Sequence, residues 1–172
     1  AAITILVAIR PWGWLPRSGL GGIEGHDEEV ATSPVILVHG YRLNRSVFLI
    51  LRAQLARAGR SSFALNLNSY AAIETQSEVL AEFVNRVRNA TGAPRVDLVG
   101  YSQGGLVCRH YIERLQGRAH VGACVTIATP HRGSRAAVFG FAKSSRQLLF
   151  GSEFLADLQA AGLSSHIAYT TI

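Results

Sequence analysis

The chain has 172 residues, of which 48% are hydrophobic and 16% charged. This length and apolar content exclude a disordered segment and predict one globular domain with a buried core. The formal net charge is +6, but the basic residues, all arginine except Lys143, are scattered singly or in pairs. Because no basic run or aromatic-interleaved basic patch occurs, we expect no nucleic-acid partner.

The cysteines do not identify the class of protein further. The two cysteines, Cys108 and Cys124, are too few for the disulfide framework of a small secreted scaffold, and their apolar surroundings predict buried thiols. The redox compartment stays open.

We expect two parts in the chain: an N-terminal apolar segment and linker over residues 1–33, and a partial catalytic domain over residues 34–172. The apolar run at residues 1–9 is too short to span a bilayer. It fits either the end of a membrane anchor or export signal, which would make the protein membrane-anchored or exported, or a buried β-strand. Residues 18–32, rich in glycine and acidic side chains, are typical of a surface loop.

From Pro34 onward, short apolar runs alternate with longer helical patterns, which predicts βαβ units and a mostly parallel sheet flanked by helices. The expected strands are Val35–His39, Phe63–Leu67, Val96–Tyr101, Gly122–Ala128 and His166–Ile172. The expected helices are Ser46–Ala58, Thr75–Ala90 and Gly104–Leu115. The apolar face of the second helix is predicted to contain Val79, Leu80, Phe83, Val84 and Val87. The fold class is therefore α/β.

The residues Gly100-Tyr101-Ser102-Gln103-Gly104 fit the pattern G-x-S-x-G, which presents a nucleophilic serine on a sharp turn from a strand into a helix. Glycines flank the serine because side chains there would crowd the turn. The pattern alone is weak in a chain with 17 glycines. Its place between a predicted strand and a predicted helix supplies the required context, so we expect Ser102 to be the nucleophile.

A second element follows the first predicted strand: His39-Gly40-Tyr41. Gly40 would let the backbone approach a substrate carbonyl, and the backbone N–H groups of Tyr41 and Gln103 would then form the oxyanion hole. We expect His39 to pack and to hydrogen-bond locally rather than to transfer protons.

These residues resemble bacterial lipases and related esterases of the α/β-hydrolase superfamily. The resemblance rests on His39-Gly40, the elbow VDLVGYSQGG (96–105), the run TIATPHRGS (126–134) and, more weakly, GSEFLADL (151–158). The resemblance extends from about Pro34 to the C-terminus, and it implies an α/β-hydrolase fold and ester hydrolysis through an acyl-enzyme at Ser102. In this family the histidine that matches His131 belongs to a loop that shapes the floor of the active site.

The serine needs a base, and the base needs a carboxylate, in the chain order Ser, Asp or Glu, His. Asp157 and His166 are the only pair after Ser102 in the right order and with plausible loop or terminal positions, but Asp157 lies within a predicted helix, where a solvent-facing carboxylate is ordinary. The resemblance implies instead that the catalytic aspartate directly follows the strand ending at Ile172 and that the histidine comes later. We therefore expect the printed sequence to lack both groups.

An ester or lipid is the expected substrate, and no metal or cofactor is implied because no cluster of histidine and carboxylate has ligand spacing. The segment Ser134–Leu149 fits either an apolar lid that opens at a lipid interface or an ordinary helix packed on the core. Three alternatives stay open at this point: an acyltransferase, a lipid-anchor deacylase, and a catalytically silent binding domain of the same fold.

Overall fold

The computed structural model describes residues 33–172. The predicted N-terminal apolar run and the loop at residues 18–32 lie outside the described residues. The described elements, in chain order, are β1 (Val35–Val38), η2 (Arg45–Phe48), α2 (Leu49–Arg57), β2 (Ser62–Leu65), α3 (Ile73–Thr91), β3 (Val96–Tyr101), α4 (Gln103–Arg114), η3 (Gly117–Ala119), β4 (Val121–Ile127), η4 (Arg135–Phe139), α5 (Lys143–Gln147), α6 (Glu153–Ala160) and β5 (Ala168–Thr171).

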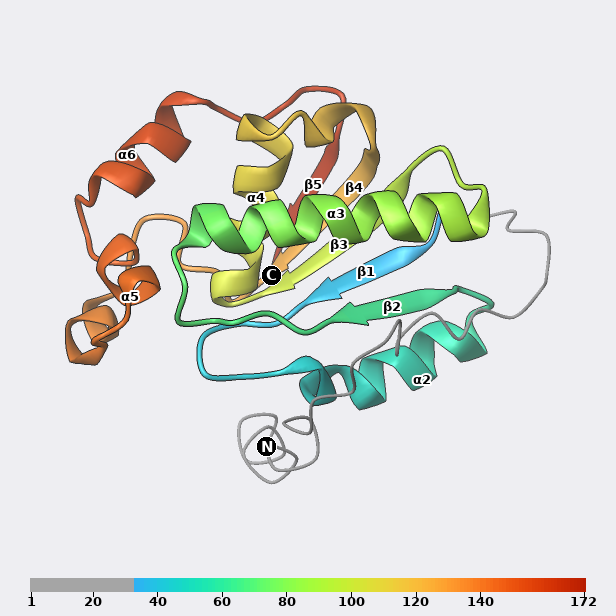
Figure 1. Ribbon diagram of the computed structural model, residues 1–172, viewed down its shortest axis with the longest axis horizontal. Coiled ribbons are helices and arrows are strands. Elements are labelled where there is room, and N and C mark those ends of the chain that lie inside the picture. Colours follow the sequence, from blue (N-terminus) through green and yellow to red (C-terminus); the bar gives the residue numbers. More distant parts are fainter. Residues whose placement is uncertain (1–32) are drawn as a thin grey trace.

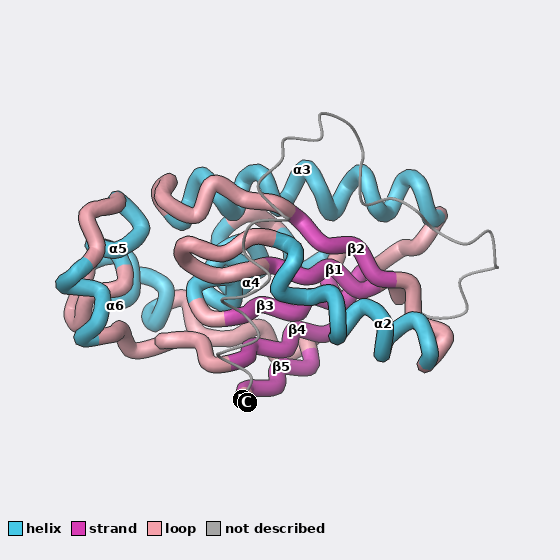
Figure 2. Tube along the Cα trace, turned by 90° about the horizontal axis from the view of Figure 1, so that it is seen from below, coloured by secondary structure: helices cyan, strands magenta, loops and turns pink. Residues whose placement is uncertain are grey.

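The five strands form one sheet in the order β2-β1-β3-β4-β5, and every neighbouring pair is parallel. The predicted fold class is thereby confirmed. Because all strands run the same way, their carboxyl ends meet at one edge, where loops can gather a site. Both views place α5 and α6 beyond this edge (Figure 1 and Figure 2).

Strand alternation divides the core into two layers. Ile36 and Val38 face the larger cluster, which contains the buried residues of α3 and α4, whereas Val35 and Leu37 face a smaller cluster with Phe48 and the partly buried residues of α2. Since β1 is buried on both faces, its sequence is continuously apolar rather than alternating.

Helix α3 confirms the predicted helix and corrects one residue of its predicted face. Leu80, Val84 and Val87 are fully buried, but Val79 is 38% exposed. The polar residue Ser77 is buried in its place, with its hydroxyl donating to the carbonyl of Ile73 at 2.7 Å. An apolar count on a helical wheel cannot anticipate a polar side chain that satisfies itself against its own backbone.

Two other predicted segments have more detail than the sequence indicated. The helix expected over Ser46–Ala58 begins with the 3₁₀ turn η2 before α2, and Gly59 follows it with a positive φ of 68°. The segment Ser134–Leu149, for which a lid and a packed helix were both predicted, contains two short helices, η4 and α5. No helix within residues 33–172 has both the length and the apolar character needed to cross a membrane.

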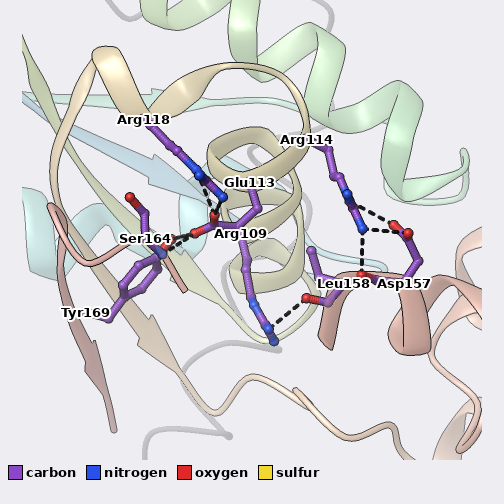
Figure 3. A network of polar contacts seen from close by, with 8 residues as sticks. All are labelled: Arg109, Glu113, Arg114, Arg118, Asp157, Leu158, Ser164 and Tyr169. Atoms are coloured by element: carbon purple, nitrogen blue, oxygen red, sulfur yellow. Dashed lines mark hydrogen bonds and ion pairs between the residues drawn. The ribbon is translucent and has the colours of Figure 1, made fainter. Parts of the chain in front are cut away.

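Helix α4 holds the segment that leads into β5 through a buried carboxylate (Figure 3). Glu113 accepts hydrogen bonds from the Tyr169 hydroxyl at 2.6 Å and the Ser164 backbone N–H at 2.9 Å, and Arg118 pairs with it at 2.6 Å. The Glu113 side chain is 0% exposed, so these donors replace the water it has lost. Burial, followed by the contact with Glu113, raises the pKa of the Tyr169 hydroxyl.

Helix α4 also forms a hydrogen bond and an ion pair with α6. The Arg109 guanidinium donates to the Leu158 carbonyl at 2.9 Å, and Arg114 pairs with the Asp157 carboxylate at 2.6 Å (Figure 3). Together these contacts tie the helix that begins beside Ser102 to both α6 and the edge strand.

Candidate active site

Ser102 lies directly after β3, at the carboxyl edge of the sheet, and forms the N-cap of α4. Its backbone has a φ of 53° and a ψ of −123°, a conformation that residues with a side chain rarely adopt. Its N–H donates to the carbonyl of Ile127 at 2.8 Å, which fixes the turn against β4. The strained serine therefore stands where the pattern G-x-S-x-G predicts it.

The glycines of both motifs are required by close contacts. A Cβ at Gly40 would lie 2.8 Å from the Ser102 Cβ and 3.3 Å from its Oγ, closer than side chains pack. A Cβ at Gly104 would overlap the carbonyl oxygen of Val38, and one at Gly100 would overlap the backbone of Gly105. The loop after β1 and the turn after β3 are thus in direct contact only because these positions lack side chains.

Backbone strain gathers at this edge of the sheet. Besides Ser102, positive φ angles occur at Arg42 (57°), four residues after β1, and at Ala128 (48°), directly after β4. Strained residues persist only where surrounding contacts hold them, and they are concentrated at functional sites. Three neighbouring strands therefore end in backbone conformations that are costly to maintain.

The geometry also leaves two donors available near the serine. Within residues 33–172, neither the Tyr41 N–H nor the Gln103 N–H donates to a protein acceptor. Gln103 is the first residue of α4, so its N–H points out of the helix end, where the helix dipole favours negative charge. This is the arrangement expected for two oxyanion donors.

His39 is buried and its two ring nitrogens are both engaged. Nε2 accepts from the Leu67 backbone N–H at 2.9 Å, and Nδ1 lies 3.0 Å from the Gly40 carbonyl, to which it donates in the neutral tautomer. Burial lowers the pKa of His39, which favours this neutral form. Its contacts join β1 to the loop after β2 and are those of a structural residue.

A residue that the sequence did not single out, Ser69, connects the parts of the site. Its Oγ accepts from the Arg42 N–H at 3.0 Å, next to Tyr41. Its carbonyl accepts from the Gln103 side chain at 3.2 Å and from the Ser144 hydroxyl of α5 at 2.8 Å. Ser69 thus joins the loop after β1, the turn at Ser102 and helix α5, and no local pattern marks it because its partners are 27 to 75 residues away.

The weak candidates for the remaining triad residues are not brought to the serine. Asp157 is paired with Arg114 on the surface of α6, and His166 is exposed. Among the described residues, no hydrogen bond links either side chain to Ser102.

His131 lies in the loop after β4, with its Nε2 at 3.0 Å from the Thr126 hydroxyl, which in turn contacts the Thr171 hydroxyl at 3.1 Å. Burial and the Arg109 charge lower the pKa of His131. These contacts suit the predicted role in shaping the site floor, which stays a prediction. In the described part of the chain, no three His, Cys, Asp or Glu side chains are grouped so that they could hold a metal ion.

The segment between β4 and α6 presents a row of exposed apolar side chains. Val138 is 68%, Phe139 84% and Phe141 96% exposed, beyond the carboxyl edge of the sheet. The 3₁₀ helix η4 has no buried residue, but its Ala137 is partly buried and packs against the core, so both alternatives for this segment stay open. Ser144 and Ser145 of α5, by contrast, are buried.

Comparison with known families matches this architecture. The family model described as alpha/beta hydrolase fold matches residues 33–157. The chain belongs to the α/β-hydrolase fold family. The predicted membership is therefore confirmed, and the elbow at Ser102 lies inside the matched residues of this hydrolase-fold chain.

Similar proteins carry lipase names. A triacylglycerol lipase of Burkholderia plantarii is 32% identical over 155 residues, covering 77% of this α/β-hydrolase chain and 43% of the relative. A triacylglycerol lipase of Pseudarthrobacter phenanthrenivorans is 35% identical over 115 residues, covering 62% of this chain and 35% of the relative. The chain thus spans less than half the length of these curated relatives.

Solved structures agree on the fold. The mature form of the Bacillus licheniformis lipase BlEst2 superposes with a TM-score of 0.74 at 20% identity, covering 86% of this chain and 67% of that chain. Aspergillus fumigatus lipase B gives a TM-score of 0.70 at 23% identity, covering 91% and 39% of the two chains. At such identities the likeness establishes the shared α/β-hydrolase fold.

Proposed function

We propose that residues 34–172 form the nucleophile-bearing part of a serine-dependent carboxyl-ester hydrolase of lipase or esterase type. One observation carries the proposal: the strained Ser102 lies in contact with Gly40, beside two backbone N–H groups without protein acceptors. The names of the similar lipases support an ester as the substrate.

In this reaction the Ser102 Oγ attacks the ester carbonyl carbon while a base removes its proton. The carbonyl oxygen becomes an oxyanion, which accepts from the N–H groups of Tyr41 and Gln103. Preorganised donors of this kind are worth ~3 kcal/mol each in the transition state. The oxyanion then collapses while the base returns the proton to the departing oxygen, so that the alcohol leaves and the acyl group stays on Ser102. In the second round the base takes a proton from water, which attacks the acyl group, and the proton passes back to Ser102 as the acid leaves. We assign the base to none of the described histidines, because none is bonded to Ser102.

We further propose that the row Val138, Phe139 and Phe141 contacts a lipid interface. Exposed aromatic and aliphatic side chains lose contact with water when they enter the headgroup boundary. Support comes from their exposure and from the bond between Ser144 and Ser69, which connects the lid segment to the site.

A fluorophosphonate probe tests the nucleophile. We expect the protein expressed from its complete reading frame to be labelled at Ser102, as located by peptide mass spectrometry, and its Ser102→Ala variant to remain unlabelled. The matched control is Ser165→Ala: Ser165 is exposed, its side chain forms no hydrogen bond within residues 33–172, and the variant should label as the wild type does. If the folded protein from the complete reading frame carries no label, the proposal fails and the silent-domain alternative is favoured.

A further inference from the structure

A cavity of about 340 Å³ lies beside the oxyanion loop and has no role in the steps above. It is lined by residues 42–44 of the loop after β1 and residues 66–70 of the loop after β2. Its walls touch the site at two places: the Tyr70 ring packs edge-on against Tyr41, with 5.4 Å between centroids, and Ser69 holds the Gln103 side chain. The cavity therefore adjoins residues that contact Tyr41 and Gln103, the two proposed oxyanion donors.

The hydrogen-bonding groups of this cavity are mainly donors. The Asn66 Oδ1 accepts from the Arg45 N–H and the Asn68 Oδ1 from the Tyr70 N–H, each at 3.2 Å. A backbone donor at each oxygen fixes the orientation of the two amides, which leaves their Nδ2 groups as donors. Neither Nδ2 group has a protein acceptor among the described residues.

The charge around the cavity also favours an anionic ligand. Arg42 is exposed, and its guanidinium forms no ion pair with any described residue. Among residues 33–172, no acidic residue lines the cavity, and none occurs in the sequence between Glu29 and Glu74. A guanidinium with two amide donors and no carboxylate is suited to a carboxylate or phosphate oxygen.

We propose that this cavity binds an anionic group of the ester substrate, a carboxylate or a phosphate, through Arg42, Asn66 and Asn68. The inference rests on the proposed ester hydrolysis and deepens it, because it distinguishes an ester that carries a negative charge from a neutral one. Free inorganic phosphate offers the same oxygens, so the experiment separates the two sources.

The first test compares two 4-nitrophenyl esters, the neutral butyrate and the negatively charged hemisuccinate, in the wild type and in Arg42→Gln, both expressed from the complete reading frame. We expect Arg42→Gln to lower the ratio of kcat/KM for the charged ester to that for the neutral ester by about tenfold, since one charge-assisted hydrogen bond is lost. The wild-type ratio should also fall with added salt, because exposed charges are screened. The ratio cancels any general loss of activity.

Arg95→Gln is the matched control. The substitution removes the same charge as Arg42→Gln. Arg95 is exposed and precedes β3, at the opposite end of the strand from Ser102. Its ratio should equal that of the wild type. An unchanged ratio in Arg42→Gln, or an equal fall in both variants, would overturn the proposal.

A binding measurement on Ser102→Ala keeps the inference testable apart from catalysis. Monomethyl succinate should shift the amide resonances of Asn66 and Asn68 in NMR spectra, and the shifts should disappear in the Arg42→Gln double variant. Absence of Arg42-dependent shifts would refute anion binding in the cavity. Shifts with inorganic phosphate alone identify a free-anion site and overturn the substrate assignment. If monomethyl succinate causes these shifts but the wild type is not labelled at Ser102, the hydrolase proposal is refuted and only anion binding in the cavity is supported.

Discussion

The contact between Gly40 and Ser102 offers a sharp test of the site. In Gly40→Ala, the new Cβ would lie 2.8 Å from the Ser102 Cβ and 2.9 Å from the Tyr101 carbonyl oxygen. Carbon atoms pack at ~3.5 Å or more, so the loop and the serine would have to separate by roughly 0.7 Å. Because the Tyr41 N–H lies on the Gly40 side of this contact, while Ser102 and the Gln103 N–H lie on the other, the shift separates groups that we propose act together.

A displacement approaching 1 Å costs roughly 100-fold in rate when it misplaces reacting groups. We therefore expect Gly40→Ala to lower the rate of fluorophosphonate labelling, or kcat/KM for a 4-nitrophenyl ester, by about that factor. Thermal unfolding followed by circular dichroism measures the accompanying loss of stability.

Gly92→Ala serves as the control. Gly92 caps α3 with a φ of 69°, and a Cβ there would meet nothing within 4 Å. It should lower the free energy of unfolding by roughly 1 kcal/mol, because the left-handed conformation disfavours side chains, without changing the labelling rate of the folded protein. A Gly40→Ala variant that labels at the wild-type rate would refute the reasoning from steric contact.

Two further predictions concern stability. Tyr169→Phe removes the 2.6 Å bond to the buried Glu113 and should lower the free energy of unfolding by about 1–2 kcal/mol in urea titrations, whereas no loss would mean that β5 does not depend on this bond. For His39, burial lowers the folded-state pKa below 6.5, so its contribution is complete above pH 6.5 and is lost as the pH falls toward the folded pKa. The free energy of unfolding should therefore fall less below pH 6.5 in His39→Gln than in the wild type, and parallel curves would contradict the assignment.

Local patterns allowed much of the fold to be predicted. The strand Val96–Tyr101 was predicted with its observed bounds, and the α/β class with a parallel sheet followed from the alternation of short apolar runs and helical patterns. Errors appeared where tertiary packing decides: Val79 is exposed because α3 presents Ser77 to the core instead.

The sequence by itself determined the nucleophile motif and the glycines beside it, because a turn that forbids side chains leaves a mark at adjacent positions. Only the tertiary structure brought Gly40 against Ser102, made Ser69 the common partner of three segments, and placed Arg42 with Asn66 and Asn68 around one cavity. These residues come from loops far apart in the chain. Parallel strands end at one edge of the sheet, so the groups that act together meet through strand order, which no local spacing records.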